Sequence, residues 1–378
     1  MTHVSPKKNR ILVVAPTPFF SDRGTPIRIL EEVKQLVAAG FAVDILTYPI
    51  GERPLDLPDS VRIFRCLNVT PWYNKRDAGP SIEKIALDAM MQLSLTRLRI
   101  TQRYDAIHAH LHEGIQITHK SQIVSWLLRK PTLFVGDLHG SLTEEVAESG
   151  FIRSKLLLKL VMFYEHFLEK RPHILVTSSE KNTERVAAYR TKHTFTIADG
   201  VPVISGTTSK SDARTALGIQ DRGQFIAAYT GGFGSEKGIT LLLDTVRARL
   251  RDTPNLDWIL AGNMSAQQHT AFSAEFSETQ RVTLITPLSY HALPHVLAAA
   301  DFGVDPKPLT STQASGKWMN YAGAGSIPVH LAAEPALLTE LVRDPELRHR
   351  KQAETKAYAA AHSWETTMHP LIDIYARL

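Results

Sequence analysis

Short apolar runs alternate with helical patterns along the chain, and this alternation restricts the possible fold more than any other feature. Ile11 to Ala15 is a β-branched run, and Phe41 to Tyr48 is the next. Between them, one helical face carries Ile27, Leu30, Val33, Leu36 and Val37. The rhythm continues with strand-like runs at 105–110, 131–135 and 174–178. Strands that alternate with helices predict a parallel sheet covered by helices, so we expect an α/β first half.

A second series of the same kind follows residues 191–216, where Gly200, Pro202, Gly206 and a Ser/Thr-rich stretch predict a linker. The expected strands are 225–229, 258–261, 282–285, 302–304 and 327–330, and the expected helices are one from Thr240, 291–300 and 316–323. The 378 residues suit two domains. We predict Rossmann-like domains at 1–195 and 196–361, with parallel sheets facing a central cleft. A helix at 362–378 is expected to pack back on the first domain.

Composition excludes several classes of protein. The single cysteine, Cys66, cannot form an internal disulfide or a cysteine-based zinc cluster. We find no signal-peptide core and no run of about 18 uncharged apolar residues, and we expect a cytoplasmic protein, at most at the inner face of a membrane. The net charge of +5 suits an anionic partner. Nucleic acid is not expected, because acidic residues are interspersed and no basic, aromatic-rich strand occurs.

The segment Tyr229 to Gly238, YTGGFGSEKG, leads from an apolar strand through a glycine-rich loop to a helix. Such a loop lets backbone N–H groups and the positive helix end approach a phosphate, with Lys237 as a charge partner. Lys237 is followed by Gly238 rather than Ser or Thr, so the loop is not that of a P-loop ATPase. The alternative is a structural glycine turn with an exposed lysine.

A second informative segment is Ser315 to Val329, SGKWMNYAGAGSIPV. Lys317, Asn320 and Tyr321 fall at i, i+3 and i+4 on one side of a short helix, and we expect that side to face a sugar nucleotide. The small residues from Ala322 to Gly325 suit close helix packing and a turn into a buried strand.

With these segments, the sequence resembles the GT-B-fold glycosyltransferases of the large retaining group called family 4, over nearly the whole chain. Gly231 to Gly238 is similar to the family's "GRLxxEKG", and Ser315 to Val329 to its "SnKLLEYMAxGxPVV". The other matching segments are 105–110, 136–140, 176–179, 198–201 and 299–306. The order and spacing of these motifs resemble the polysaccharide- and glycolipid-biosynthesis type most.

The resemblance implies a hexosyltransferase that moves a sugar from a UDP- or GDP-sugar to a saccharide or lipid-linked acceptor, with retention of configuration. It implies His139 and Lys237 as catalytic residues, at the anomeric centre and the leaving diphosphate. The implied donor-binding residues are Gly24, Gly231, Gly232, Lys237, Thr286, Leu288, Lys317 and Asn320, and the implied acceptor-binding residues are Arg23, His110 and His112. No cofactor and no metal are expected if Lys237 and helix termini stabilise the leaving charge.

The sequence departs from the family pattern at three positions. Gly232 replaces the arginine expected beside Lys237, and Thr312 and Asn320 stand where the family has two glutamates. A lost charge-assisted contact would cost about 1.5 to 3 kcal/mol. Gln313 and Asn320 resemble a subgroup with "TExNGKLLNYMA". The departures leave two alternatives open: a non-catalytic protein that binds a nucleotide sugar, and a nucleotide-sugar epimerase of the same fold.

Three histidines, His108, His110 and His112, alternate along a predicted strand, so we expect all three to point to one face. A metal site is the alternative that we disfavour. We expect His108 to be a core residue, and His110 or His112 to contact the acceptor at the end of the strand.

The segment Phe151 to Arg171 combines twelve apolar residues with five Lys and Arg. We favour a core helix, because the apolar positions cover much of its circumference. Contact with an anionic membrane surface is the alternative.

Overall fold

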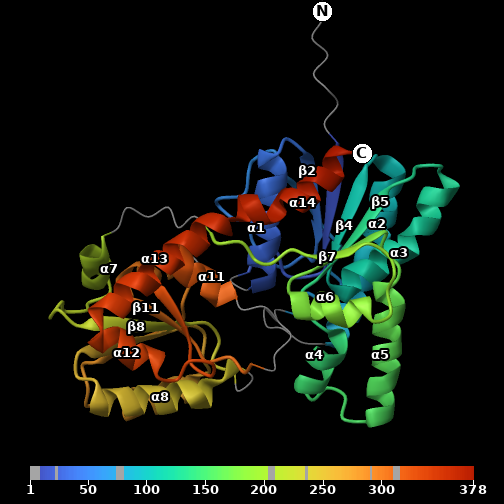
Figure 1. The fold of residues 1–378 in the computed structure, drawn as a ribbon. Coiled ribbons are helices and arrows are strands. Elements are labelled where there is room, and N and C mark those ends of the chain that lie inside the picture. Colours follow the sequence, from blue (N-terminus) through green and yellow to red (C-terminus); the bar gives the residue numbers. More distant parts are fainter. Residues whose placement is uncertain are drawn as a thin grey trace, which may run out of the picture. The chain divides into compact units, whose positions relative to one another are not determined.

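The computed structural model describes residues 9–21, 24–73, 81–202, 209–234, 237–289, 292–309 and 316–378 (Figure 1). The chain divides into two compact units. Unit 1 comprises Met1–Asp199, Thr312–Ala314 and Thr367–Leu378, and unit 2 comprises Gly200–Ser311 and Ser315–Thr366. No described helix combines the length and the apolar character needed to cross a membrane.

Unit 1 is built on a seven-stranded parallel sheet in the order β3-β2-β1-β4-β5-β6-β7. Its strands are β1 (Arg10–Ala15), β2 (Ala42–Thr47), β3 (Arg62–Arg65), β4 (Ala106–His110), β5 (Leu133–Leu138), β6 (Ile174–Thr177) and β7 (Thr194–Thr196). Its helices are α1 (Gly24–Ala38), α2 (Ile82–Thr101), α3 (Leu111–Leu127), α4 (Leu142–Glu148), α5 (Lys155–Glu169), α6 (Glu180–Ala187) and most of α14 (Trp364–Ala376).

Successive side chains of the central strands of unit 1 point alternately to the two faces of the sheet, where they pack against different helices. Leu12 and Val14 of β1 join a core with Leu87 of α2 and Ile115 of α3. Such an arrangement explains why these strands are continuously apolar, since a parallel sheet is buried on both faces. The predicted strands and first helix agree with the structure, whereas the short strands β3 and β7 carry no comparable apolar signal.

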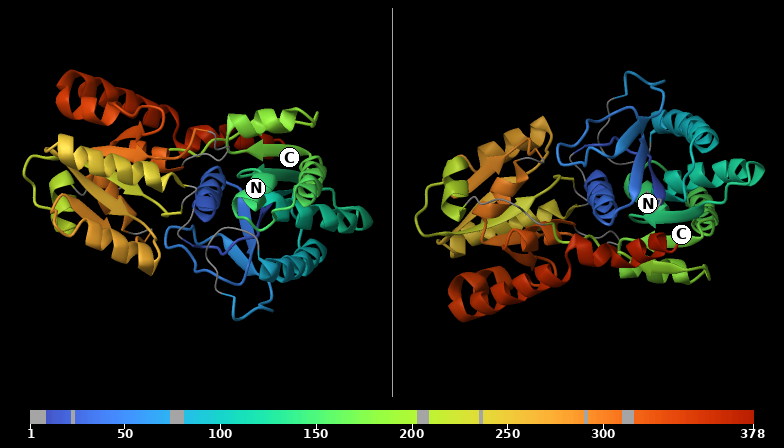
Figure 2. Two further views of the ribbon diagram at one scale, coloured as in Figure 1. Left: turned by 90° about the horizontal axis from the view of Figure 1, so that it is seen from below. Right: turned by 90° about the horizontal axis from the view of Figure 1, so that it is seen from above.

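Unit 2 contains a five-stranded parallel sheet in the order β10-β9-β8-β11-β12. Its strands are β8 (Phe225–Thr230), β9 (Leu256–Ala261), β10 (Val282–Ile285), β11 (Phe302–Asp305) and β12 (Ile327–His330). Its helices are α7 (Lys210–Ala216), α8 (Ile239–Asp252), α9 (Ala266–Glu275), α10 (Leu293–Ala299), α11 (Gly316–Gly323), α12 (Leu337–Arg343) and α13 (Pro345–Ala361). Separate cores on the two faces of this sheet agree with the helices seen on both sides of it in Figure 2.

In both sheets the strand order reverses at one point, between β1 and β4 in unit 1 and between β8 and β11 in unit 2. Ligands of open parallel sheets bind outside the carboxyl ends of the strands at such a point. The segments that follow these four strands are therefore where a site is expected.

The boundary between the units, after Asp199, falls within the segment 191–216 where a linker was expected. The same segment also contains β7 and α7, which lie near its two ends. One local prediction is wrong. His112 lies in the first turn of α3 rather than on the strand, since β4 ends at His110 and the backbone turns at Leu111. Only His108 and His110 share a strand face.

The expectation of a core helix at Phe151 to Arg171 is also wrong. Helix α5 buries Glu165, Leu168 and Glu169 and leaves large apolar side chains outside, with Leu156 69% and Phe163 73% exposed. The polar face of this helix points inward because partners in unit 1 neutralise its carboxylates.

Helix α14 spans the boundary between the units, which falls between Thr366 and Thr367. Met368, Leu371 and Tyr375 are fully buried. The Tyr375 ring lies 6.1 Å from the ring of Phe41, and the Tyr375 carbonyl accepts a hydrogen bond from Asn9. The end of the chain thus completes the core of unit 1.

Candidate functional site

The glycine-rich loop of unit 2 depends on three glycines with positive φ at the strand reversal. A Cβ at Gly262, after β9, would lie 1.7 Å from the Gly231 carbonyl oxygen. A Cβ at Gly238, before α8, would lie 2.0 Å from the Pro306 carbonyl oxygen. These contacts show that the ends of β8, β9 and β11 and the start of α8 lie close together. Only glycine fits where the backbone segments approach so closely.

Lys317 of α11 reaches this loop. A Cβ at Gly231 would lie 2.6 Å from Lys317 Cε, and Lys317 Nζ lies 5.4 Å from the centre of the Tyr229 ring. The two segments that the sequence singled out separately therefore meet at one place.

Tyr321 holds α11 against the sheet. Its hydroxyl accepts a hydrogen bond from the Thr230 N–H at 2.9 Å and lies 3.3 Å from the Val304 carbonyl oxygen. A Cβ at Gly303 would lie 1.9 Å from the Tyr321 ring. The prediction that Tyr321 faces a ligand is wrong, because the side chain is fully buried as part of the core.

Helix α8 begins at Ile239 with Gly238 as its N-cap, and among the described residues no side-chain hydrogen bond caps its first N–H groups. Uncapped N–H groups and the helix dipole favour a bound anion. Lys237 and Lys317, both half-buried, supply cations in the same region of unit 2. This end of the sheet is suited to bind a diphosphate.

The remaining predicted donor residues lie on the same side of unit 2 or at the start of α1. Gly232 is exposed, and its carbonyl accepts a hydrogen bond from the Tyr229 hydroxyl. Thr286 follows β10, Leu288 packs partly on the core, and Asn320 is half-buried on α11. In unit 1, Gly24 is the exposed first residue of α1, with open space around its Cα.

At the strand reversal of unit 1, Arg28 of α1 is the centre of a buried ion-pair network. Its guanidinium lies 2.8 Å from Glu32, 3.2 Å from Asp137 and 2.7 Å from Asp199. Burial opposes the charge of Arg28, but these carboxylates outweigh it and raise its pKa. Burial and the neighbouring carboxylates of Asp137 and Asp199 raise the pKa of Glu32 above its usual value, although Arg28 opposes this shift.

His139 borders this network at the end of β5. Its Nε2 lies 3.1 Å from Nδ1 of His110 and 3.6 Å from Asp137. Burial lowers the pKa of His139 to about 4, so the ring is neutral near pH 7. Its side chain is 11% exposed, whereas those of His108 and His110 are almost completely covered. His139 is therefore the ring of the three that reaches the surface of unit 1.

The ligand atoms of Glu32, His108, His110 and Asp137 all lie within 4.8 Å of one another, close enough to hold a metal ion. Arg28 already pairs with both carboxylates, and its charge would repel a cation at this place. The donor set therefore fits an ion-pair network better than a metal centre, and the absence of a metal requirement stays a prediction.

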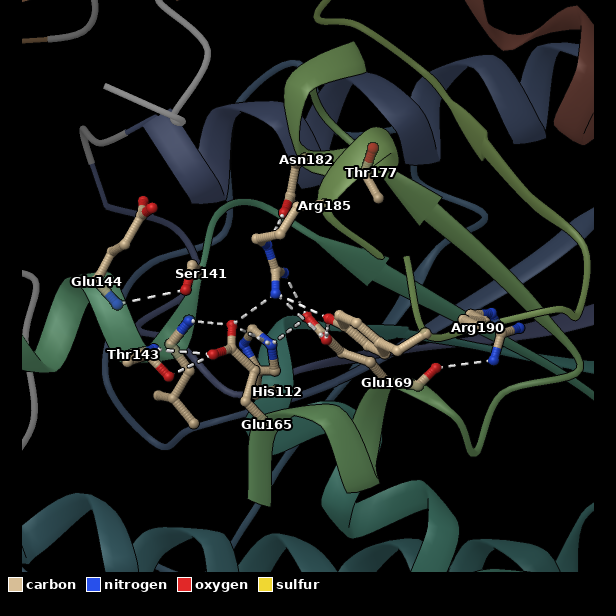
Figure 3. A network of polar contacts seen from close by, with 12 residues as sticks. His112, Ser141, Thr143, Glu144, Glu165, Glu169, Thr177, Asn182, Arg185 and Arg190 are labelled. Carbon is tan, nitrogen blue, oxygen red and sulfur yellow. Dashed lines mark hydrogen bonds and ion pairs between the residues drawn. The ribbon is translucent and has the colours of Figure 1, made fainter. Parts of the chain in front are cut away.

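His112 belongs to a second buried network, shown in Figure 3. Its Nε2 lies 3.2 Å from Glu169, and Arg185 of α6 lies 2.5 Å from the same carboxylate. Burial opposes ionisation of Glu169, but His112 and Arg185 lower its pKa to about 2. Glu165 accepts hydrogen bonds from the N–H groups of Leu142 and Thr143 at the start of α4.

Burial does not favour direct contact of His110 or His112 with an acceptor, which stays a prediction. Arg23, Thr312 and Gln313 lie outside the described residues. Sequence reasoning missed Arg28, Glu32 and Asp137. The available signal was the i, i+4 pair of opposite charges, Arg28 and Glu32, within an apolar helix.

No protein-family model matches the sequence, and no curated protein matches it. Solved structures resemble it along its length. Sucrose-phosphate synthase from Thermosynechococcus elongatus superimposes with a TM-score of 0.74 at 16% identity, over 98% of this chain and 99% of that one. Anabaena HepE, in complex with UDP and glucose, gives 0.68 at 14% identity, over 98% and 100%. The chain has the GT-B fold.

A third similar structure is that of WaaG, described as a glycosyltransferase involved in lipopolysaccharide biosynthesis. It superimposes with a TM-score of 0.65 at 15% identity, over 96% of this chain and 99% of WaaG. The two parallel sheets of seven and five strands confirm the fold predicted from the alternating pattern. At sequence identities this low, the structural similarity establishes the fold only, and the reaction has to be inferred from the residues of the site.

Proposed function

We propose that the protein transfers a sugar from a nucleotide-diphosphate sugar to a saccharide or glycolipid acceptor. The observation that carries the proposal is the convergence of Gly231, Gly238, Lys237 and Lys317 at the strand reversal of unit 2. Enzymes with this fold, such as HepE with UDP and glucose, support a nucleotide donor. We propose a UDP- or GDP-sugar and retention of configuration, on the resemblance of the motifs to the retaining family 4.

In this proposal the donor diphosphate lies against the glycine loop and the first turn of α8. Lys237 and Lys317 would neutralise the negative charge that develops on the leaving diphosphate. Such electrostatic stabilisation is strongest when the charged groups are already in position before the reaction. Thr286 and Leu288 would contact the base, and Asn320 would contact the ribose. Gly24 and Gly232 would let the backbone approach the phosphates. Transfer then needs no metal and survives chelation.

Unit 1 would present the acceptor. His139, neutral and partly exposed, would orient an acceptor hydroxyl or accept its proton. Arg23, His110 and His112 complete the proposed acceptor region, with His110, whose Nδ1 lies 3.1 Å from His139 Nε2, as a positioning residue. The Arg28 network would fix the His139 ring in place through Asp137.

The test is binding and turnover of a panel of labelled UDP- and GDP-sugars. We expect Lys237→Ala to weaken donor binding about 10- to 100-fold, the equivalent of one charge-assisted contact. Lys356→Ala, an exposed lysine of α13, is the matched control and should bind like the wild type. Equal binding by wild type and Lys237→Ala would contradict the proposed donor site.

Turnover separates the alternatives. Transfer to an acceptor, or slow hydrolysis to free sugar and nucleotide that requires His139, supports the transferase. Tight binding without either product indicates a non-catalytic binding protein. Conversion of the donor into an isomeric nucleotide sugar indicates an epimerase.

We also propose that the protein contacts an anionic membrane through helix α5, which would bring a lipid-linked acceptor within reach. Leu156, Leu160, Phe163 and Phe167 form a stripe at helical spacing and are all exposed. The acidic residues of α5 are buried, while Lys155 and Lys159 are exposed. An apolar stripe with only basic charges beside it is suited to an anionic lipid surface.

Vesicle sedimentation tests this contact. We expect Leu160→Glu with Phe163→Glu to reduce binding to vesicles of phosphatidylglycerol and phosphatidylcholine. Leu55→Glu changes a residue that is 87% exposed elsewhere in unit 1 and should leave binding unchanged. Equal reduction by both substitutions would contradict a specific surface on α5.

A further inference from the structure

A cavity of about 350 Å³ lies at the opposite edge of the unit 1 sheet from His139. Arg10 begins β1, Asp105 precedes β4 and Thr132 precedes β5, so the cavity lies at the amino ends of these strands. It is separated from the carboxyl edge by the length of β4, about 16 Å for five residues at roughly 3.3 Å each. It does not belong to the proposed donor or acceptor regions.

Charge at this cavity is strongly unbalanced. Five basic side chains and a single carboxylate border it: Arg10, Arg99, Arg103, Arg129, Lys130 and Asp105. Arg10 is already engaged, because its guanidinium pairs with Asp44. Arg103 and Arg129 are exposed and form no ion pair with any residue that the structure describes. The charges of Arg103 and Arg129 therefore have no counter-ion in the part of the chain that the structure describes.

Arg99 of α2 is the unusual member of the group. It is 5% exposed, yet it forms no ion pair with any carboxylate among the described residues. One nitrogen donates to the Ser121 carbonyl and to the Ser125 hydroxyl, while Nε and Nη2 have no hydrogen-bond partner among the described residues. Burial without a counter-charge lowers its pKa to about 10. A buried guanidinium is costly unless an anion compensates it.

We infer that this cavity is a second, separate binding site for a phosphate group, with Arg99 at its base and Arg103 and Arg129 at its rim. The planar guanidinium groups of Arg103 and Arg129 match the geometry of a phosphate and can donate to its oxygens, while Arg99 adds a positive charge at the base of the cavity. The volume accommodates the phosphate together with part of the molecule that carries it. The inference does not depend on the proposed transferase activity.

The surroundings favour a lipid head group as the source of the phosphate. Trp126 is 76% exposed, and Leu127 and Leu128 are also exposed, directly before Arg129 and Lys130 at the end of α3. Exposed apolar residues beside basic ones suit the interface of an anionic membrane. A free phosphorylated metabolite is the other source of the same chemistry.

The first arm measures binding of inorganic phosphate and of glycerol phosphate by calorimetry, in the Lys237→Ala background to remove the proposed donor site. We expect Arg99→Gln to weaken binding about 10- to 100-fold. Arg103→Ala with Arg129→Gly tests the rim without disturbing the core, and glycine suits the positive φ of Arg129. Arg251→Ala, an exposed arginine of unit 2, should have no effect.

The second arm measures sedimentation with vesicles containing phosphatidylglycerol, against phosphatidylcholine alone. Loss of vesicle binding in the Arg99 and rim variants supports a lipid head group, and loss of phosphate binding alone supports a free phosphate compound. If neither phosphate compound binds, or if binding is the same in all variants, the inference is overturned. Wild-type nucleotide-sugar binding by Arg99→Gln would show that any effect is separate from the donor site.

Discussion

His139 and Lys317 illustrate how single residues acquire chemistry from their place in a sheet. His139 directly follows the carboxyl end of β5, and Lys317 lies in the first turn of α11, the helix after β11. The family resemblance selected His139, and helical spacing selected Lys317, before their neighbours were known. Burial sets the lowered pKa of His139, with smaller effects from the neighbouring Asp137 and from Arg28 and Asp199. No local pattern in the sequence connects His139 with Arg28 or Asp199.

The lowered pKa of His139 predicts a specific pH dependence of stability. The unfolded chain binds a proton near pH 6.5, whereas the folded ring does so only near pH 4. Acidification from pH 6.5 to 4 therefore favours unfolding by up to about 3 kcal/mol through this residue. His139→Gln cannot titrate, so chemical denaturation should show a smaller loss of stability in this window. Parallel curves for the two proteins would contradict the assignment.

The Glu169 ion pairs predict a large effect from one neutral substitution. Glu169→Gln removes the buried carboxylate that His112 and Arg185 share, and it should lower the free energy of unfolding by about 1.5 to 3 kcal/mol, because Arg185 keeps Glu165 at 3.4 Å. Glu354→Gln breaks an exposed pair with Lys351 at 2.9 Å and should cost less than about 1 kcal/mol. The contribution of ionised Glu169 should be present above pH 4.5 and be lost as the pH falls toward 2. Urea denaturation at pH 7 and pH 3 measures both effects.

At the scale of elements, strands and helices with strong periodicity were predictable, and elements fixed by tertiary contacts were not. The runs at β1, β8 and β9 are apolar on both faces, which the parallel sheet requires. β7 has three residues and depends on pairing with β6. Helix α5 was wrongly predicted to be a core helix because its apolar residues face outward. In the sequence, the only signal of its buried side is the pair of glutamates at i, i+4, Glu165 and Glu169. Their partners Arg185 and His112 lie on other helices.

The start of α8 provides a test at this scale. Gly238→Ala would bring a Cβ to 2.0 Å from the Pro306 carbonyl, so the loop must move and donor binding should fall at least tenfold. Gly218→Ala has a similar positive φ with open space around it and should cost only about 1 kcal/mol of stability, from backbone strain. Calorimetry with UDP and GDP, together with thermal unfolding, separates loss of the loop from general destabilisation.

At the scale of the molecule, each unit has its own sheet and core, which predicts that ligands stabilise the units separately. A UDP or GDP ligand at 100 times its Kd should stabilise unit 2 by about 2.7 kcal/mol. Hydrogen exchange should show this protection in β8, β9 and α8, and much less in β1 and β4. Lys237→Ala should remove the protection at the same ligand concentration. Equal protection of both sheets would contradict a donor site carried by unit 2.

The position of α14 governs the order in which the protein forms during translation. The sheet of unit 1 is encoded by the first two hundred residues, but Tyr375 and its neighbours fill a part of its core that nothing else supplies among the described residues. Unit 2 is encoded between these two parts. We therefore expect the core of unit 1 to be completed only after the residues of unit 2 have left the ribosome, when α14 becomes available to pack on it.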